Sequence, residues 1–238
     1  MEWLIESVKR LMKYLFRFKK SESIRWLGHL DILRAFERAI RRSSLPVAFT
    51  LGFNPREKLA FASALGVGAT ASDEKGTVEL TEHIPPVELL TRLNENLPPG
   101  LQILETREIA DQGSRDLLNR YRLAHIEMTC DCSELTTLEE AQLAADHLMV
   151  KECLSVKRHK EGAKDREFNA RTAIRQLQAV NLENHRLIFS LHLLLLQEGS
   201  VKPAEVVQLL QNEIPGLKLR RIHRRDLAEY NENIEISS

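Results

Sequence analysis

The spacing of hydrophobic residues along 13–109 changes from that of a strand to that of a helix and back. Residues 14–19 alternate, with Tyr14, Phe16 and Phe18 on one side, which is typical of a half-buried strand. Over 29–42 the spacing becomes helical. The expected apolar stripe of this helix is Leu30, Leu33, Phe36 and Ile40, and Pro46 follows as a stop signal. Strands are also expected at about 58–65, 76–82 and 101–109, with a loop at 66–72 and a helix starting at Pro85–Pro86.

Residues 121–225 show the same order of patterns. Thr137 is a suitable cap for a helix over 138–149, and Pro203 begins a second helix that ends near Asn212. The strand-like segments are 121–129, 152–159, 186–197 and 217–224.

The order of strand, helix, two strands, helix and strand therefore occurs twice. It predicts an α+β protein of two tandem ferredoxin-like (split βαβ) units, with antiparallel sheets and helices on one face. The expected parts are a lead-in helix at 1–12, units at 13–109 and 120–225, a linker at 110–119 and a polar tail at 226–238.

Composition places the chain among ordinary globular proteins. It has 238 residues, of which 43% are hydrophobic and 29% charged. No apolar run approaches the ~20 residues of a membrane helix, so no membrane partner is expected. The odd set of Cys130, Cys132 and Cys153 has neither disulfide nor zinc spacing, and a cytoplasmic location without a metal or other cofactor is expected.

Charge is distributed unevenly although the formal net charge is zero. Residues 1–60 hold 13 basic and 6 acidic side chains, whereas 61–150 hold 6 and 16. Such a chain can present a basic face to a polyanion. The alternative is that these residues form ordinary solvated faces.

The helix over 29–42 carries the most regular basic pattern. Its arginines recur at intervals of four and three, which places them along one exposed stripe. One guanidinium group can donate two hydrogen bonds to the oxygens of a phosphate, so the stripe is a candidate RNA site. Ordinary surface pairing, as between Glu37 and Arg41, is the alternative. The candidate residues are Arg34, Arg38, Arg41 and Arg42, with Arg56 and Lys58 in the following turn.

A second basic run surrounds a turn at Gly162 and predicts a β-hairpin. It could hold an RNA groove or a single strand, although three acidic residues are interleaved and Phe168 is its only aromatic residue. The last strand adds a basic run at 220–225. The candidate RNA-binding residues of the hairpin are Lys157, Arg158, Lys164, Arg166 and Arg171.

His29 and Asp31 open the basic helix, and each has two interpretations. His29 could act as a general base near neutral pH, or it could be a packing or capping residue. Asp31 could bind substrate, or it could interact with the helix dipole. The turn GFNPREK could form an anion-binding concavity, or it could be a loop that needs Gly52 for its backbone angles.

Several motifs resemble the bacterial radical-SAM-linked protein family, whose members are fused to or encoded beside cobalamin-binding radical SAM proteins. They are HLD at 29–31, GFNP at 52–55 with Lys58, LGVGA at 65–69, VKRHKEGAKDREFNART at 156–172 and VKPAEVV at 201–207. The strand order is also similar to that of the CRISPR repeat-processing endoribonucleases, a likeness of fold alone.

The resemblance implies a radical SAM enzyme as partner. The three cysteines lack the close spacing that an iron–sulfur cluster needs, so the radical chemistry would belong to that partner. The leading hypothesis is a non-catalytic, substrate-recognition accessory that binds RNA through the basic helix and hairpin. The alternatives are an RNA-processing or RNA-modifying enzyme with His29 as base, and a protein-interaction module that docks through the acidic middle region.

Overall fold

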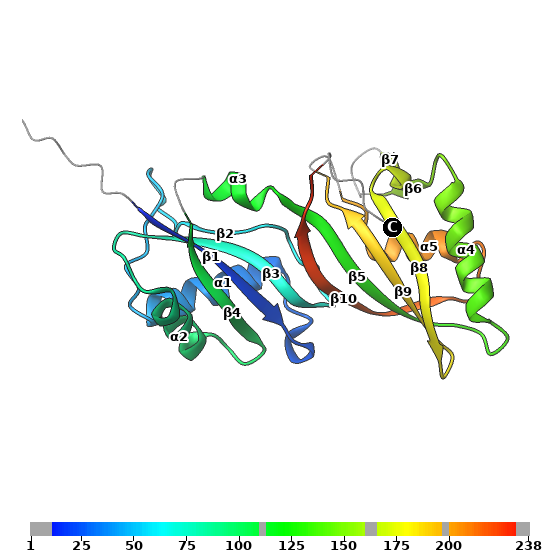
Figure 1. The fold of residues 1–238 in the computed structure, drawn as a ribbon, viewed down its shortest axis with the longest axis horizontal. Helices are drawn as coiled ribbons and strands as arrows, with labels where there is room; N and C mark the ends of the chain where they lie inside the picture. Colours follow the sequence, from blue (N-terminus) through cyan, green and yellow to red (C-terminus); the bar gives the residue numbers. More distant parts are fainter. Residues whose placement is uncertain (1–10, 110–112, 160–165, 197–199, 232–238) are drawn as a thin grey trace, which may run out of the picture. The chain divides into compact units, whose positions relative to one another are not determined.

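A computed structural model of the protein describes residues 11–109, 113–159, 166–196 and 200–231 (Figure 1). Five α-helices and ten strands lie in the described ranges, and nearly all the strand pairs are antiparallel. The expected α+β class is therefore confirmed. The chain forms two compact units, an N-terminal unit of Met1–Val67 and Asp73–Asn119 and a C-terminal unit of Gly68–Ser72 and Arg120–Ser238.

The N-terminal unit builds its sheet in the order β4-β1-β3, with β2 paired to β3. The helix α1 begins and ends where the hydrophobic spacing predicts. The elements are β1 (Met12–Lys20), α1 (His29–Arg42), β2 (Leu59–Phe61), β3 (Ala69–Leu80), α2 (Pro86–Asn96), β4 (Leu101–Ile109) and α3 (Ser114–Leu118), with a 3-10 turn at Glu22–Ile24.

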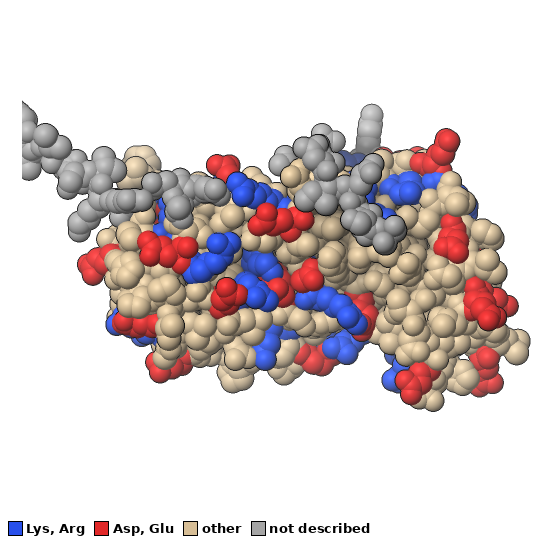
Figure 2. Space-filling view, viewed as in Figure 1, with Lys and Arg blue, Asp and Glu red and all other residues tan. Residues whose placement is uncertain are grey.

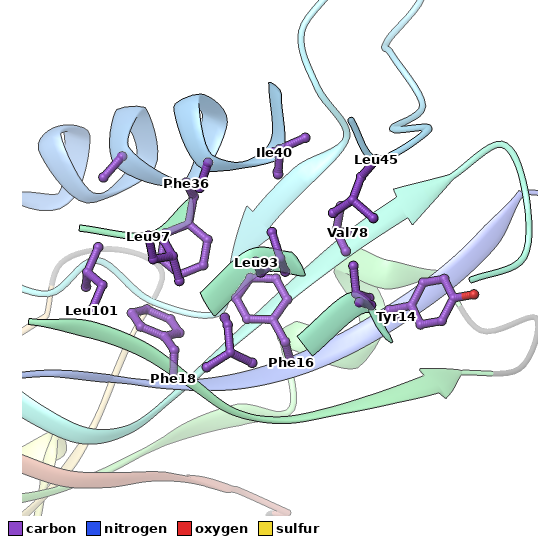
Figure 3. Close-up of a cluster of buried hydrophobic side chains, with 14 of the residues drawn as sticks. Tyr14, Phe16, Phe18, Phe36, Ile40, Leu45, Val78, Leu93, Leu97 and Leu101 are labelled. Carbon is purple, nitrogen blue, oxygen red and sulfur yellow. The ribbon is translucent and has the colours of Figure 1, made fainter. Parts of the chain in front are cut away.

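One hydrophobic core holds this unit together (Figure 3). The alternating residues of β1, Tyr14, Phe16 and Phe18, are buried and point toward the two helices. Phe36 of α1 stacks on Phe16 with ring centroids 5.4 Å apart, and α2 adds Leu89 and Leu93 to the same cluster. Because both helices meet the same side of β1, they cover the same face of the sheet.

The C-terminal unit has the strand order β10-β5-β9-β8, and the first residues of β3 pair in parallel with β10. A separate hairpin, β6–β7, follows α4. The elements are β5 (Tyr121–Asp131), α4 (Leu138–Val150), β6 (Ser155–Arg158), β7 (Arg166–Asn169), β8 (Ile174–Glu183), β9 (Arg186–Leu194), α5 (Pro203–Leu210) and β10 (Lys218–Glu229), with a 3-10 turn at Ala170–Thr172.

The core of the C-terminal unit again lies between a sheet and two helices. Ala124, Ile126, Met128 and Cys130 are the buried alternate positions of β5. The helices α4 and α5 contact each other, and they contact β8 and β10 respectively. The predicted cap of α4 is confirmed, because the backbone N–H of Glu140 donates to Oγ1 of Thr137 at 3.1 Å.

Five features differ from the sequence-based expectations. The expected loop at 66–72 contains the start of β3, and β8 lies in a segment for which no strand was predicted. Leu30 does not belong to the apolar stripe of α1, since it is 62% exposed, and Ile32, Ala35 and Ala39 are buried instead. The range expected to be a linker contains α3, and β10 continues to Glu229, beyond the expected start of the tail. The predicted lead-in helix falls almost wholly on residues 1–10, which lie outside the described ranges.

Candidate nucleic-acid interface

The first turn of α1 is shaped by the residues of the HLD motif. Oδ2 of Asp31 accepts a hydrogen bond from the backbone N–H of Gly28 at 3.0 Å, which satisfies a group at the helix start. His29 lies edge-on to Phe61, with ring centroids 5.9 Å apart. Burial lowers the pKa of His29, and the carboxylate of Glu74 offsets part of that effect. These contacts are those of a packing residue and a cap.

Two arginines on the outward face of α1 are available to a ligand. Arg34 and Arg38 are exposed and lie four residues apart on the helix. Neither side chain has an ion pair or hydrogen bond with any residue that the structure describes. Their guanidinium groups therefore carry charge that is not neutralised by a direct contact.

The last two arginines of α1 are engaged within the unit. Nε of Arg41 donates to Oε1 of Glu57 at 2.6 Å, and the side chain of Glu57 is only 3% exposed. This hydrogen bond holds the pKa of Glu57 below its usual value. Arg42 donates to the backbone carbonyl of Asn96 at the end of α2. Both arginines join α1 to neighbouring segments, which reduces their capacity to bind phosphate.

The turn after α1 also contains one engaged cation, Lys58, and one available cation, Arg56. Nζ of Lys58 forms an ion pair with Glu79 at 3.1 Å, and Glu79 also accepts a hydrogen bond from the hydroxyl of Ser114 at 2.8 Å. The side chain of Arg56 is exposed and has no partner among the described residues. Arg56 is therefore the cation of this turn that remains available.

The same turn carries apolar side chains that the charge pattern did not single out. Leu51 and Phe53 are both fully exposed, at 101% and 105%, and Phe49 is half exposed. A signal was present in the sequence, because GFNP places an aromatic residue inside a Gly-Asn-Pro turn, where no core is available to it.

Two of the candidate cations of the second basic run have structural contacts. Arg158 binds Glu205 of α5 through two hydrogen bonds of 2.6 and 2.7 Å, and its guanidinium lies 4.4 Å from the centre of the Phe168 ring. Arg171 donates to the carbonyls of Met149 at 3.0 Å and Ile174 at 2.8 Å. These arginines join the hairpin and the turn after it to the helices and sheet of their unit.

The remaining hairpin candidates are exposed or lie outside the described ranges. Lys157 and Arg166 are exposed and have no partner among the described residues, and Glu167 is opposite Lys157 in the strand register. Lys164 and the turn at Gly162 lie outside the described residues.

On the face shown in Figure 2, basic and acidic side chains are interspersed, with no large area of a single sign of charge.

The sheet of the C-terminal unit carries a histidine pair that sequence reasoning missed. The rings of His125 and His192 lie 4.1 Å apart, and Nδ1 of His125 is 2.9 Å from Oδ1 of Asp226. Burial lowers the pKa of His192, and the neighbouring His125 lowers it further. Pairing across β5, β9 and β10 brings these residues together, and no spacing within the sequence indicates it.

Most cations of the basic run at the C-terminal strand are also engaged. Arg220 pairs with Asp131, and Arg225 pairs with Glu127 at 2.6 Å.

In the parts of the chain that the structure describes, no group of three or more His, Cys, Asp or Glu side chains is arranged to hold a metal ion. None of the described helices is both long enough and apolar enough to cross a membrane.

A shallow pocket of 490 Å³ lies beside the first turns of α4. Leu135 and Leu143 are its exposed apolar residues, at 87% and 57%. Glu213, which also lines the pocket, is bound by Lys151 and His147, and these contacts lower the pKa of Glu213. The pocket is therefore lined by both apolar and polar side chains, and the charge of its Glu213 carboxylate is partly neutralised.

Solved structures with a similar fold share little sequence with this chain. A chain in the crystal structure of a Cbf5-Nop10-Gar1 complex matches with a TM-score of 0.52 and 6% identity, over 89% of this protein and 47% of that chain. The structure of an H/ACA RNP bound to a substrate RNA containing 2'-deoxyuridine gives 0.49, and that of the archaeal box H/ACA sRNP Nop10-Cbf5 complex gives 0.47, both at 6% identity over 89% of this protein and 46% of the other chain. The protein thus spans about half the length of these chains, and the first match shows a shared fold alone.

Comparison with sequence families gives the assignment. No match was found among curated proteins. Residues 13–214, most of the chain, match a family described as an uncharacterized protein conserved in bacteria. The chain belongs to this family, DUF2344.

Proposed function

We propose that this protein binds RNA through the outward face of α1 and serves as a non-catalytic recognition subunit for an enzyme that acts on that RNA. The observation that carries the proposal is the exposure of Arg34 and Arg38, which have no partner among the described residues. The other cations of the helix are engaged by Glu57 and by a backbone carbonyl. Arg34 and Arg38 therefore keep a positive charge that an external anion can bind.

The geometry of α1 suits a phosphate backbone. Residues four apart on a helix lie on one face, separated by a rise of about 6 Å. Arg34 and Arg38 can therefore contact neighbouring phosphates of one strand at the same time. Arginine provides donors in a planar fork that matches phosphate oxygens, so such contacts fix the position of the backbone without reading its sequence.

The enzyme partner is proposed on the sequence resemblance alone. Motifs such as HLD and GFNP resemble the radical-SAM-linked family, and this implies a radical SAM enzyme that supplies the chemistry. Burial raises the pKa of the Cys130 thiol to about 12, so this thiol is protonated near neutral pH. A cytoplasmic location is part of the same proposal.

We also propose that each unit is a ferredoxin-like fold. The order β4-β1-β3-β2 of the N-terminal unit corresponds to β10-β5-β9-β8 of the C-terminal unit, if the β6–β7 hairpin is treated as an insertion. An experimental structure in which either unit has a different strand order would overturn this assignment.

The test of RNA binding is the double substitution Arg34→Ala/Arg38→Ala, measured by fluorescence anisotropy with RNA at several salt concentrations. For a single-stranded RNA, the slope of log affinity against log salt should become shallower by about 0.7 for each phosphate that the variant no longer neutralises. Affinity should fall for all RNA sequences alike, because backbone contacts carry no sequence information.

A matched control removes two other arginines from the same unit. Arg107 and Arg115 are exposed on β4 and α3, so Arg107→Ala/Arg115→Ala changes the net charge by the same amount. It should keep the affinity and the slope of the wild type. Equal losses in the two double variants, or no loss in the α1 variant, would overturn the proposal.

A further inference from the structure

Residues 49–57 form a short arm that projects from the N-terminal unit. At its base Phe49 bridges to Glu57, and the backbone N–H of Thr50 donates to the carbonyl of Arg56 at 2.8 Å. The N–H of Arg56 returns a bond to Oγ1 of Thr50 at 3.0 Å. These contacts close a hairpin whose tip is residues 51–55.

The base of the arm is fixed to its unit, whereas the tip is open. The Arg41–Glu57 pair ties the base to α1, and the N–H of Ala48 donates to the carbonyl of Glu79 on β3 at 2.8 Å. Gly52 has a φ of +124°, which residues with side chains rarely adopt, so this glycine is needed for the shape of the tip.

The tip presents apolar surface that has no structural use within the unit. Phe53 and Leu51 are as exposed as in an extended chain, whereas Phe16, Phe18 and Phe36 are nearly or completely buried. Burying an apolar side chain of this size away from water is favourable. An arm that leaves both of these side chains exposed is suited to bury them against a ligand.

Cations accompany the arm. Arg56 is exposed within it, and Arg38 lies one helical turn before Arg41, the residue that holds the base of the arm. The base of the arm therefore lies beside the C-terminal end of α1, about one helical turn from Arg38. Aromatic side chains combined with a cationic track are what single-stranded nucleic acids require, since bases stack on the rings while arginines hold the phosphates.

We infer that Phe53 stacks on an unpaired base of the RNA bound by α1, and that the ligand is therefore single-stranded. This inference rests on the proposed function. A duplex offers its backbone to α1 but keeps the faces of its bases covered by neighbouring pairs, so it gives Phe53 no stacking partner.

The test compares substitutions of Phe53 on two RNA probes. The probes are an oligouridine of roughly 12 nucleotides and a duplex of the same length, both measured by fluorescence anisotropy. Phe53→Ala should weaken binding of the single strand about fivefold or more, the effect of removing one base–aromatic stack. Phe53→Tyr, which keeps the ring, should bind the single strand as the wild type does, and no Phe53 variant should alter binding of the duplex.

Phe53→Leu is the decisive variant, because leucine keeps apolar surface but cannot stack. The inference predicts that it behaves like Phe53→Ala. If Phe53→Leu binds as tightly as the wild type, or if the duplex loses as much affinity as the single strand, the stacking role is wrong.

The proposed function and this inference fail in different ways. If Arg34→Ala/Arg38→Ala binds both probes like the wild type, RNA binding by α1 is wrong whatever Phe53 does. If the arginine variant loses affinity and Phe53→Ala does not, only the stacking inference is wrong. Because Phe53 is fully exposed, its variants should keep the stability of the wild type, which thermal unfolding would verify.

Discussion

The basic helix α1 and the basic hairpin β6–β7 look alike in the sequence and differ in the structure. On α1, Arg34 and Arg38 are exposed and have no partner within the described residues, and pairing is confined to the end of the helix. In the hairpin, Arg158 is bound to Glu205 and to the carbonyl of Ser200. Two of the four arginines of the helix, Arg34 and Arg38, thus remain available, whereas Arg158, at the end of β6, is engaged in holding its own unit together.

The difference has a simple electrostatic cause. A guanidinium that donates two hydrogen bonds to a carboxylate has little remaining potential for an external phosphate, since the carboxylate cancels its charge at short range. Glu205 accepts two such hydrogen bonds from Arg158, Glu57 accepts one from Arg41, and both carboxylates are buried. The number of basic residues in a segment therefore overestimates the charge that its surface presents.

The largest expected effect is the loss of stability on Arg158→Ala. This change leaves Glu205, a buried carboxylate, without its bidentate partner, and we expect the free energy of unfolding to fall by about 2–3 kcal/mol. Urea unfolding followed by circular dichroism measures it. The adjacent Lys157→Ala is the control and should stay within about 0.5 kcal/mol of the wild type. Similar losses in both variants would break the distinction between engaged and available cations.

An intermediate effect is expected at acid pH from the Arg41–Glu57 pair. The pKa of Glu57 is lower in the folded state than its ordinary value of 4.5, so the pair stabilises the protein above that value and the contribution disappears as pH falls through the folded pKa. Arg41→Ala should therefore lose less stability than the wild type between about pH 5 and pH 3. Urea unfolding at a series of pH values measures the difference.

Arg42→Ala is the matched control for this pH effect. Arg42 donates to a backbone carbonyl, which does not titrate, so its removal should leave the pH dependence parallel to that of the wild type. If the stability of Arg41→Ala falls with pH as steeply as that of the wild type, the pair does not contribute to the acid dependence. Arg41 would then be available to an external phosphate, like Arg34 and Arg38.

The smallest effect is expected for Lys157→Ala/Arg166→Ala, which removes the available cations of the hairpin. Glu167 is opposite Lys157 and reduces the local potential, so RNA affinity should fall less than in Arg34→Ala/Arg38→Ala, by about twofold. Anisotropy with the same RNA probes ranks the two variants. A larger loss in the hairpin variant would reverse the comparison and make the hairpin the main phosphate site.

Sequence reasoning succeeded where local pattern determines structure. The helix α1 and the strand β4 have the expected bounds, and Thr137 caps α4 as predicted. It missed β8 because two bulges, at Ile174/Gln176 and Ala179/Asn181, interrupt the alternation on which strand prediction depends. The start of β3 was also missed, since Ala69 and Ala71 carry too little apolar surface to reveal a strand and are held by pairing with β10.

The candidate site could be predicted only in part, for a related reason. The exposed arginines of α1 follow from helical spacing, but their neighbours are neutralised by partners that are distant in the sequence. Arg158 and Glu205 are separated by 47 positions, and Arg41 and Glu57 by 16. Such pairs depend on tertiary contacts, which a single sequence does not encode in any local pattern.

The assignment of Gly68–Ser72 to the C-terminal unit has a practical consequence for anyone who divides this protein into pieces. A fragment that begins at Arg120 would lack the strand residues that pair with Ile222 to Arg224, and the exposed backbone of β10 could then recruit another chain. A cut at that position should therefore produce aggregation, and a usable C-terminal fragment needs residues 68–72 restored, for example by circular permutation.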